Sequence, residues 1–300
     1  MMPATRAALY AVKLTHAQHR LQGVIPTSVA LDCVGAMAKC PRDIANMLDI
    51  LCVEKTKPGP PTYTSFLGSG WSDLRVGVLD PKDWPWPNYL AKLDPGAQAQ
   101  INEEVSAAYS KISGLAQAFT AVSLPKTAVF DSAGELAPFV VMKADFRRDL
   151  NDYLAELQDA PVRTLKEIIQ FNYDHSEQEL ADGYEDQSLL LQAQRNAMDP
   201  AKRDELLRRI QHQSRDGGID KALDENNIDV ILCAADSEIN VYTCCSGYPS
   251  AHMPLSYLKY NGRPFGIIAI TRAHAESALV KVMSAWENTF PARLPPRSLL

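Results

Sequence analysis

The chain has 300 residues, of which 46% are hydrophobic and 22% are charged, and its formal net charge is −6. These values are ordinary for a globular protein and allow one large α/β domain or two smaller ones. A net negative chain without a concentrated basic face is not expected to bind nucleic acid. No apolar run approaches the roughly 18 residues that a membrane-spanning helix needs, so no membrane partner is expected.

The N-terminal residues and the cysteines bear on the location of the protein. Residues 1–31 contain Arg6, Lys13 and Arg20 but no acid before Asp32, as organellar transit peptides also do. The segment is poor in serine and runs without a break into a motif-like stretch. This favours a part of the folded domain over a targeting peptide. Six cysteines without a C-x-x-C pair, in a chain without a secretory signal, favour reduced thiols and a cytoplasmic location.

The first half of the chain alternates helical and strand patterns. Apolar residues at helical spacing predict a helix over 41–51, although Cys40 is a poor N-terminal cap. A Pro-, Gly- and Ser-rich stretch over 57–73 predicts a loop. Three further elements follow, in chain order a strand at 74–80, a helix that starts at Asp94 and Pro95, and a strand at 119–124. A strand, a crossover helix and a second strand form a βαβ unit, which favours a parallel sheet.

The second half continues the same alternation. Thr164 and Glu167 form a capping-box pattern at the start of a helix. Another helix is predicted to begin at Asp199 and to end near Gly217 and Gly218. The remaining predicted elements are a short helix around Ala222, strands at 228–234 and 265–270, and a helix at 275–290. The sequence therefore predicts the α/β class, with helices that cover a mixed sheet.

Three segments carry motifs in a fixed order. The first is PATRAALYAVKLTHAQHRLQGVIPTSVALDCVGAMAKCPRD, the second joins VRTLKEIIQFN to GIDKALDENNIDVILCA, and the third is CCSGYPSAHMPLSYLKYNGRPFGIIAITRA. Their residues and spacing resemble the amidase signature family of Ser-Ser-Lys amide hydrolases, in the form found in fungi and bacteria. The resemblance runs from Pro3 to about Arg297. In the third segment seven positions fit the family pattern, namely Gly247, Tyr248, Pro249, Pro254, Gly262, Pro264 and Gly266.

Other positions depart from the family pattern, and several of them replace a glycine or a proline. They are Leu14 for Pro, Ala17 for Gly, Cys33 for Thr, Ala36 for Pro, Cys40 for the helix cap, Ala235 and Asp236 for Pro-Thr, and Thr271 for Gly. Because glycine and proline often encode special backbone angles, these departures indicate a relaxed constraint on the site.

The resemblance also implies where the catalytic groups of the family lie. The neutral lysine, the serine in a cis peptide and the attacking serine all match positions upstream of Pro3, and Lys13 matches a different position of the motif. Residues 1–300 are therefore expected to form a single amidase-signature domain that lacks its N-terminal catalytic portion. Its expected parts are a signature-end segment and helix at 1–56, a loop at 57–73 and a C-terminal α/β portion at 74–300. No catalytic, cofactor-binding or metal-binding residue is assigned, and no cofactor is expected.

Two serines, Ser69 and Ser246, are candidates to replace the missing nucleophile. The GSG sequence at 68–70 lies in a loop without a nearby base, which favours a linker. Ser246, His252 and Asp236 provide the residue types of a catalytic triad, but no spacing enforces the hydrogen bonds that a triad needs.

Structural roles are also favoured for the other polar candidates. His16 and His19 have a spacing that could hold a metal ion, but no third ligand is evident. The stretch GVIPTSVALDCVGAM at 23–37 belongs, by the resemblance, to the wall of an active site, and its Ser28, Asp32 and Cys33 are not expected to react. Asp182, Glu185 and Asp186 are expected to form a solvated acidic face. For four tyrosines two interpretations stay open, the lining of a pocket for an aromatic or apolar substrate and buried anchors, namely Tyr10, Tyr184, Tyr242 and Tyr248.

Three functional hypotheses follow. The first is an inactive or auxiliary relative of amide hydrolases that retains a surface for a small-molecule amide. The alternative is an authentic amidase that hydrolyses a small-molecule carboxamide of specialised metabolism. In this case the catalytic segment is supplied upstream or by a second chain. The third is a binding partner of a full-length amidase or of an N-terminal-half chain.

Overall fold

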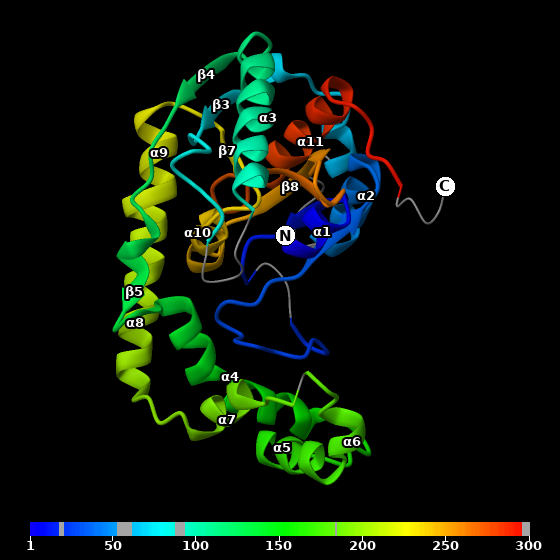
Figure 1. Cartoon of the computed structure of the whole chain (residues 1–300). Coiled ribbons are helices and arrows are strands. Elements are labelled where there is room, and N and C mark those ends of the chain that lie inside the picture. The colour runs from blue at the N-terminus through cyan, green and yellow to red at the C-terminus, as the bar shows by residue number, and fades with distance from the viewer. Residues whose placement is uncertain (18–20, 53–61, 88–93, 184, 296–300) are drawn as a thin grey trace. The chain divides into compact units, whose positions relative to one another are not determined.

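The computed structural model describes residues 1–17, 21–52, 62–87, 94–183 and 185–295. The chain divides into two compact units (Figure 1). The first unit comprises residues 1–19, 33–127 and 212–300, and the second comprises residues 20–32 and 128–211. Whether both belong to one amidase-signature domain over 1–300 stays a prediction.

The first unit is built on a seven-stranded sheet with the strand order β2-β1-β8-β9-β7-β3-β4. The strands are β1 (Tyr10–Lys13), β2 (Gly35–Ala38), β3 (Arg75–Val78), β4 (Ala118–Ala121), β7 (Val230–Ala234), β8 (Ser250–Tyr257) and β9 (Pro264–Ile270). Strand β3 pairs in parallel with both β4 and β7, whereas the other pairs are antiparallel. The predicted mixed sheet of the α/β class is therefore confirmed.

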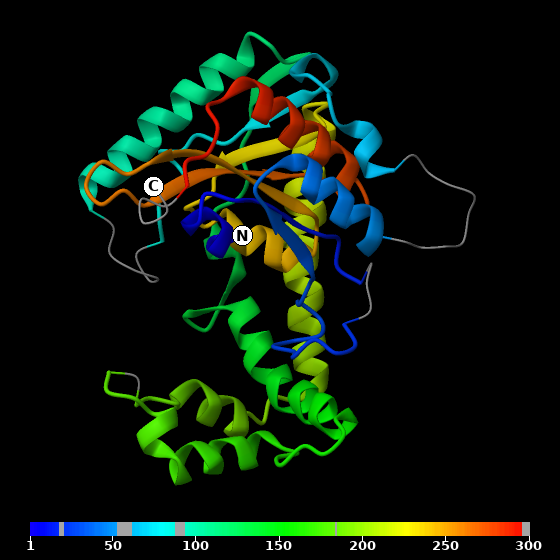
Figure 2. The same cartoon turned by 90° about the vertical axis from the view of Figure 1, so that its right-hand side faces the viewer.

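Helices cover both faces of this sheet. They are α1 (Met2–Arg6), α2 (Pro41–Leu51), α3 (Pro95–Ser113), α9 (Asp220–Glu225), α10 (Ile239–Ser246) and α11 (Glu276–Thr289), with short 3-10 turns at Tyr63–Phe66 and Trp71–Asp73 and a π turn at Arg215–Ile219. Figures 1 and 2 show α2, α3 and α11 on one face and α10 on the other. Alternate strand residues such as Val12, Leu232, Met253 and Ile267 point into the apolar core beneath α2, α3 and α11.

Several predicted elements are confirmed, because local patterns determine them. β3, α3 and β4 form the predicted βαβ unit. Asp94 caps α3 by accepting a hydrogen bond from the Ala97 N–H at 3.1 Å, and Pro95 is its first residue. Cys40 precedes α2 and its side chain makes no capping hydrogen bond, as expected because a thiol is a poor hydrogen-bond acceptor.

The predicted end of a helix near Gly217 and Gly218 is wrong. Helix α8 (Pro200–Ser214) continues through the π turn at Arg215–Ile219 directly into α9. A Cβ atom on Gly218 would lie 2.7 Å from Cε1 of Tyr242, so this glycine permits close packing rather than ending the helix.

The second unit is mostly helical. Its elements are β5 (Asp131–Ser132), β6 (Glu135–Leu136), α4 (Ala137–Glu156), α5 (Leu165–Asp174), α6 (Ser176–Glu179), α7 (Ser188–Arg195) and most of α8, while a 3-10 turn at Thr127–Phe130 lies at its start in the sequence. Leu150, Leu154, Leu165, Ile169 and Ala193 form its small core. Thr164 caps α5 as predicted, but Glu167 accepts from the Arg163 N–H instead of closing the capping box.

Candidate functional site

The end of β1 carries several polar contacts that link separate parts of the first unit. Lys13 Nζ donates to the Tyr248 carbonyl at 2.7 Å and, more weakly, to the Leu14 carbonyl at 3.3 Å. The N–H and hydroxyl of Thr15 both donate to Glu276 Oε1, at 2.9 and 2.6 Å. The residues that follow β1 are thus tied to the turn between α10 and β8 and to the first residue of α11.

Gly247 makes the turn at this site possible. It ends α10 with φ +67°, in the left-handed region, and its carbonyl accepts the His16 N–H at 2.8 Å. A Cβ atom at this position would lie 2.8 Å from Cβ of His16. Both the backbone angle and the close approach therefore require glycine, which explains one position of the third sequence motif.

Burial lowers the pKa of Lys13 below its ordinary value, and Cys33, Cys244 and Glu276 partly offset this shift. A lysine with a lowered pKa is a feature of many functional sites. Here the ammonium donates to two backbone carbonyls among the described residues, so Lys13 holds the turn at Tyr248. That Lys13 is not the catalytic lysine stays a prediction.

The predicted triad candidates do not form a triad. Ser246 Oγ accepts the Tyr248 N–H at 3.1 Å, and His252 Nδ1 lies 2.7 Å from the Leu9 carbonyl. Asp236 forms ion pairs with Arg6 and Arg263 at 2.8 and 3.0 Å. The structure thus gives the serine, the histidine and the aspartate three separate sets of partners.

A buried polar pair lies on β8, on the sheet face opposite the α11 core. Ser250 and His252 are fully buried, and neither Ser250 Oγ nor His252 Nε2 has a hydrogen-bond partner among the described residues. Because a carbonyl only accepts, Nδ1 of His252 carries the hydrogen that Leu9 receives, and Nε2 is unprotonated. Burial lowers the pKa of His252 to about 4. Ser250 and neutral His252 are therefore buried polar residues of β8.

The remaining serine and histidine candidates lie in loops. Ser69 donates to the Phe66 carbonyl at 2.8 Å, which supports a turn in the 68–70 segment. His16 follows β1 and is half-buried rather than exposed, while His19 lies outside the described residues. The described part of the chain contains no group of three or more His, Cys, Asp or Glu side chains arranged to hold a metal ion.

Three of these tyrosines, Tyr10, Tyr242 and Tyr248, lie within the described residues and each is anchored in a different place. The Tyr242 hydroxyl donates to the Pro125 carbonyl at 2.6 Å, and the Tyr248 hydroxyl donates to Asp220 at 2.5 Å. Tyr10 is buried within the α11 core, and Tyr184 lies outside the described residues. The acids Asp182, Glu185 and Asp186 are exposed, as predicted.

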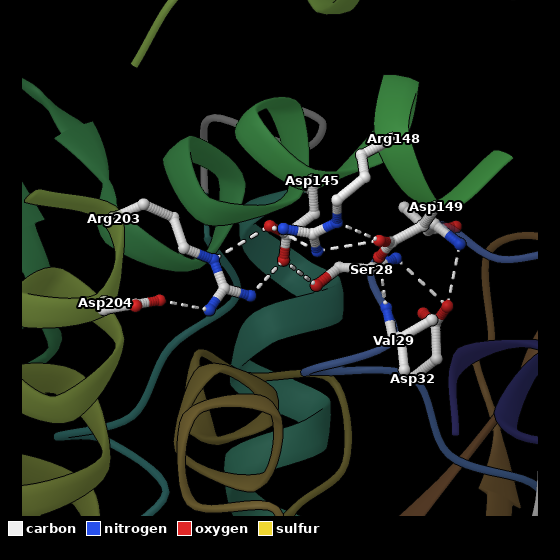
Figure 3. Close-up of polar contacts among 9 residues, drawn as sticks. Ser28, Val29, Asp32, Asp145, Arg148, Asp149, Arg203 and Asp204 are labelled. Atoms are coloured by element: carbon white, nitrogen blue, oxygen red, sulfur yellow. Dashed lines mark hydrogen bonds and ion pairs between the residues drawn. The ribbon is translucent and has the colours of Figure 1, made fainter. Parts of the chain in front are cut away.

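The stretch GVIPTSVALD has its polar partners within the second unit (Figure 3). Ser28 Oγ donates to Asp145 Oδ2 at 2.7 Å, and the Val29 N–H donates to Asp149 Oδ2 at 2.8 Å. The N–H groups of Thr27 and Ser28 donate to Asp32 Oδ2 at 2.7 and 3.0 Å. Ser28 and Asp32 therefore fix the loop. That they do not react stays a prediction.

Asp145 and Asp149 on α4 are structural anchors of this loop that the sequence analysis missed. Both carboxylates are buried, and Arg148 and Arg203 balance their charge (Figure 3). Arg203 donates to both oxygens of Asp145, with Nε 2.8 Å from Oδ1. Two aspartates spaced i, i+4 on a helix would have indicated a shared face if the helix itself had been predicted.

Two further observations concern the chain as described. None of its helices combines the length and the apolar character needed to cross a bilayer. The six cysteines form no disulfide bond.

Solved structures with the same arrangement define the class of fold. The chain superposes on the native peptide amidase from Stenotrophomonas maltophilia with a TM-score of 0.81 at 24% identity, over 99% of this chain and 61% of that one. A bacterial aryl acylamidase of the amidase signature family gives a TM-score of 0.60 at 12% identity, over 96% of this chain and 59% of the other. The chain thus has the fold of the amidase-signature proteins.

Among curated proteins, the chain is similar to a probable amidase from Arabidopsis thaliana. The two are 24% identical over 308 residues, which cover 99% of this chain and 56% of the relative. The chain therefore spans about half the length of this relative. No protein-family model matches the chain.

One departure from the family pattern has a measurable consequence. Ala17, which replaces a glycine of the motif, has φ +62°, a left-handed angle that is strained for a residue with a Cβ atom. We expect Ala17→Gly to raise the free energy of unfolding by about 0.5–1 kcal/mol, measured by urea denaturation. The matched control is Ala7→Gly, because Ala7 is exposed and has φ −109°. An equal gain in both variants would contradict backbone strain at Ala17.

Proposed function

We propose that this chain belongs to the amidase signature family and forms the part of an amide hydrolase that supports the active site. The observation that carries the proposal is the shared fold, which extends over 99% of the chain. The glycine-dependent turn at Gly247 and the carbonyl contacts of Lys13 support it, because they account for motif positions in structural terms.

We further propose that residues 1–300 alone do not hydrolyse amides. A serine hydroxyl is a weak nucleophile unless a neighbouring base takes its proton. Among the described residues, no histidine or lysine nitrogen forms a hydrogen bond with the hydroxyl of Ser69 or Ser246, the two serines that the sequence offered, or with that of buried Ser250. This supports an inactive or auxiliary role for the 300-residue chain by itself.

The test is an amidase assay of the purified 300-residue chain on simple aliphatic and aryl amides and on a peptide C-terminal amide. We expect no turnover above the buffer rate. The peptide amidase, purified in the same way, is the positive control. Turnover that is lost in Ser69→Ala, Ser246→Ala or Ser250→Ala would refute the proposal.

The alternative is that the chain is active when further residues complete the site, either upstream or on a second chain. The turn at Gly247 favours this alternative, because it keeps the backbone conformation of a motif that we propose supports the active site. Co-expression with the part of the peptide amidase that this chain does not match provides the test. Amide hydrolysis by the purified complex would support a small-molecule carboxamide substrate, whereas a stable but inactive complex would support a binding partner.

Six cysteines without a disulfide support a reducing, cytoplasmic location.

A further inference from the structure

The first unit contains a cavity of about 870 Å³ next to the end of α1. Its walls come from α1, from the connection between β8 and β9, and from the segment after α11. Arg6 and Lys259 are the cations among its described lining residues, and none of those residues is an aspartate or glutamate. Tyr257, Leu294 and Pro295 contribute apolar surface.

Arg6 is held in place before any ligand binds. Its Nη1 donates to both oxygens of Asp236, at 2.8 and 3.0 Å, and its guanidinium carbon lies 5.0 Å from the ring centre of Trp86. The side chain of Asp236 is 2% exposed, whereas that of Arg6 is 30% exposed. Within the described residues, Nε and Nη2 of Arg6 make no hydrogen bond. A fixed guanidinium with one open edge is suited to a bidentate carboxylate.

The charges around Asp236 do not balance. Arg263 also pairs with Asp236, at 3.0 Å, and lies 5.9 Å from the same Trp86 ring, so two guanidiniums share one carboxylate. Arg263 Nη2 is buried and has no hydrogen-bond partner among the described residues. This cluster therefore has a net charge of +1, and Lys259 adds a second positive charge at the cavity wall.

We propose that this cavity binds an organic carboxylate with an apolar or aromatic body, and that Arg6 is the residue that recognises the carboxylate. An anion offsets the excess positive charge, while the cavity volume and the apolar walls accommodate an organic group. The geometry favours a planar carboxylate over a phosphate. Arg6 offers one edge that can donate two parallel hydrogen bonds, whereas a tetrahedral phosphate is bound best by donors on several sides. The inference is independent of whether the chain hydrolyses amides.

The experiment is isothermal titration calorimetry of the 300-residue chain with 3-phenylpropanoate. The uncharged analogue 3-phenylpropan-1-ol and inorganic phosphate serve as comparison ligands, and none of the three contains an amide bond. We expect saturable binding of 3-phenylpropanoate, with the alcohol and phosphate each at least about tenfold weaker. Equal affinity for the alcohol, stronger binding of phosphate or no saturable binding of 3-phenylpropanoate would overturn the proposal.

Variants separate recognition from loss of structure. Arg6→Gln leaves Asp236 paired with Arg263, so we expect an unchanged circular dichroism spectrum and about 10- to 100-fold weaker binding. Lys259→Gln alters an exposed side chain and is expected to weaken binding about threefold through the lost charge. The matched control, Arg42→Gln on the exposed side of α2, is expected to leave binding unchanged. Unchanged affinity in a folded Arg6→Gln variant, or in Lys259→Gln if the former does not fold, would contradict the proposal.

Discussion

Asp145→Ala is expected to lower the free energy of unfolding of the second unit by about 3 kcal/mol. Asp145 is buried and accepts hydrogen bonds from Ser28, Arg148 and Arg203. Its removal leaves Arg203, whose side chain is 12% exposed, with the peripheral carboxylate of Asp204 as its one remaining ionic partner among the described residues. A buried cation that loses its main counter-charge keeps its desolvation cost, which makes the loss large.

The measurement combines urea denaturation with hydrogen exchange at the amides of α4 and α8. Asp152→Ala is the matched control, because Asp152 lies on the exposed side of the same helix and should change stability by no more than about 0.5 kcal/mol. In the double variant Asp145→Ala/Arg203→Ala, the loss should be smaller than the sum of the single losses. Strict additivity would show that the two side chains are not energetically coupled.

His252 is expected to make the first unit less stable as the pH falls from about 6.5 to about 4. An unperturbed histidine has a pKa near 6.5, and burial lowers the pKa of His252 to about 4 in the folded chain. Above pH 6.5 neither state binds the proton, so the contribution of neutral His252 is fully present there. Below that pH the unfolded chain binds a proton that the folded chain excludes, and about 3 kcal/mol is lost over this interval.

His252→Asn tests this expectation, because an asparagine amide can donate to the Leu9 carbonyl in place of Nδ1. The variant should have a shallower loss of stability between pH 6.5 and 4, measured by urea denaturation at several pH values. Burial raises the pKa of Asp236 to about 6, with Arg6 opposing the shift, so Asp236 adds stability as the pH falls. This effect is common to both proteins and cancels in their difference. His175→Asn, at an exposed histidine, is the control, and an equal change of slope in it would contradict the assignment to His252.

Much of the fold could be predicted because its information is local. The spacing of apolar residues determines α2, α3 and α11, and the acceptor chemistry of Asp94 and Thr164 determines two helix starts. A strand, a helix and a strand in succession also indicated the parallel pairing of β3 and β4. The end predicted near Gly217 and Gly218 failed because a glycine that stops a helix and one that allows close packing, as Gly218 does, look the same in sequence.

The candidate sites depended on contacts that no local pattern contains. Ser28 meets Asp145 across 117 residues of sequence, and Arg6 meets Asp236 across 230. Sequence reasoning assigned Ser28 no reactive role but could not identify its carboxylate partner, nor the cavity beside Arg6.

The sequence by itself determined the α/β class, the positions of the glycines in the motifs and the resemblance to amide hydrolases, because residue type and spacing express these properties directly. Only the tertiary structure decided which charges are buried together, that Ser246, His252 and Asp236 have separate partners, and that Ala17 has a strained backbone. The physical reason is that desolvation, hydrogen bonding and backbone strain depend on which distant residues packing brings into contact.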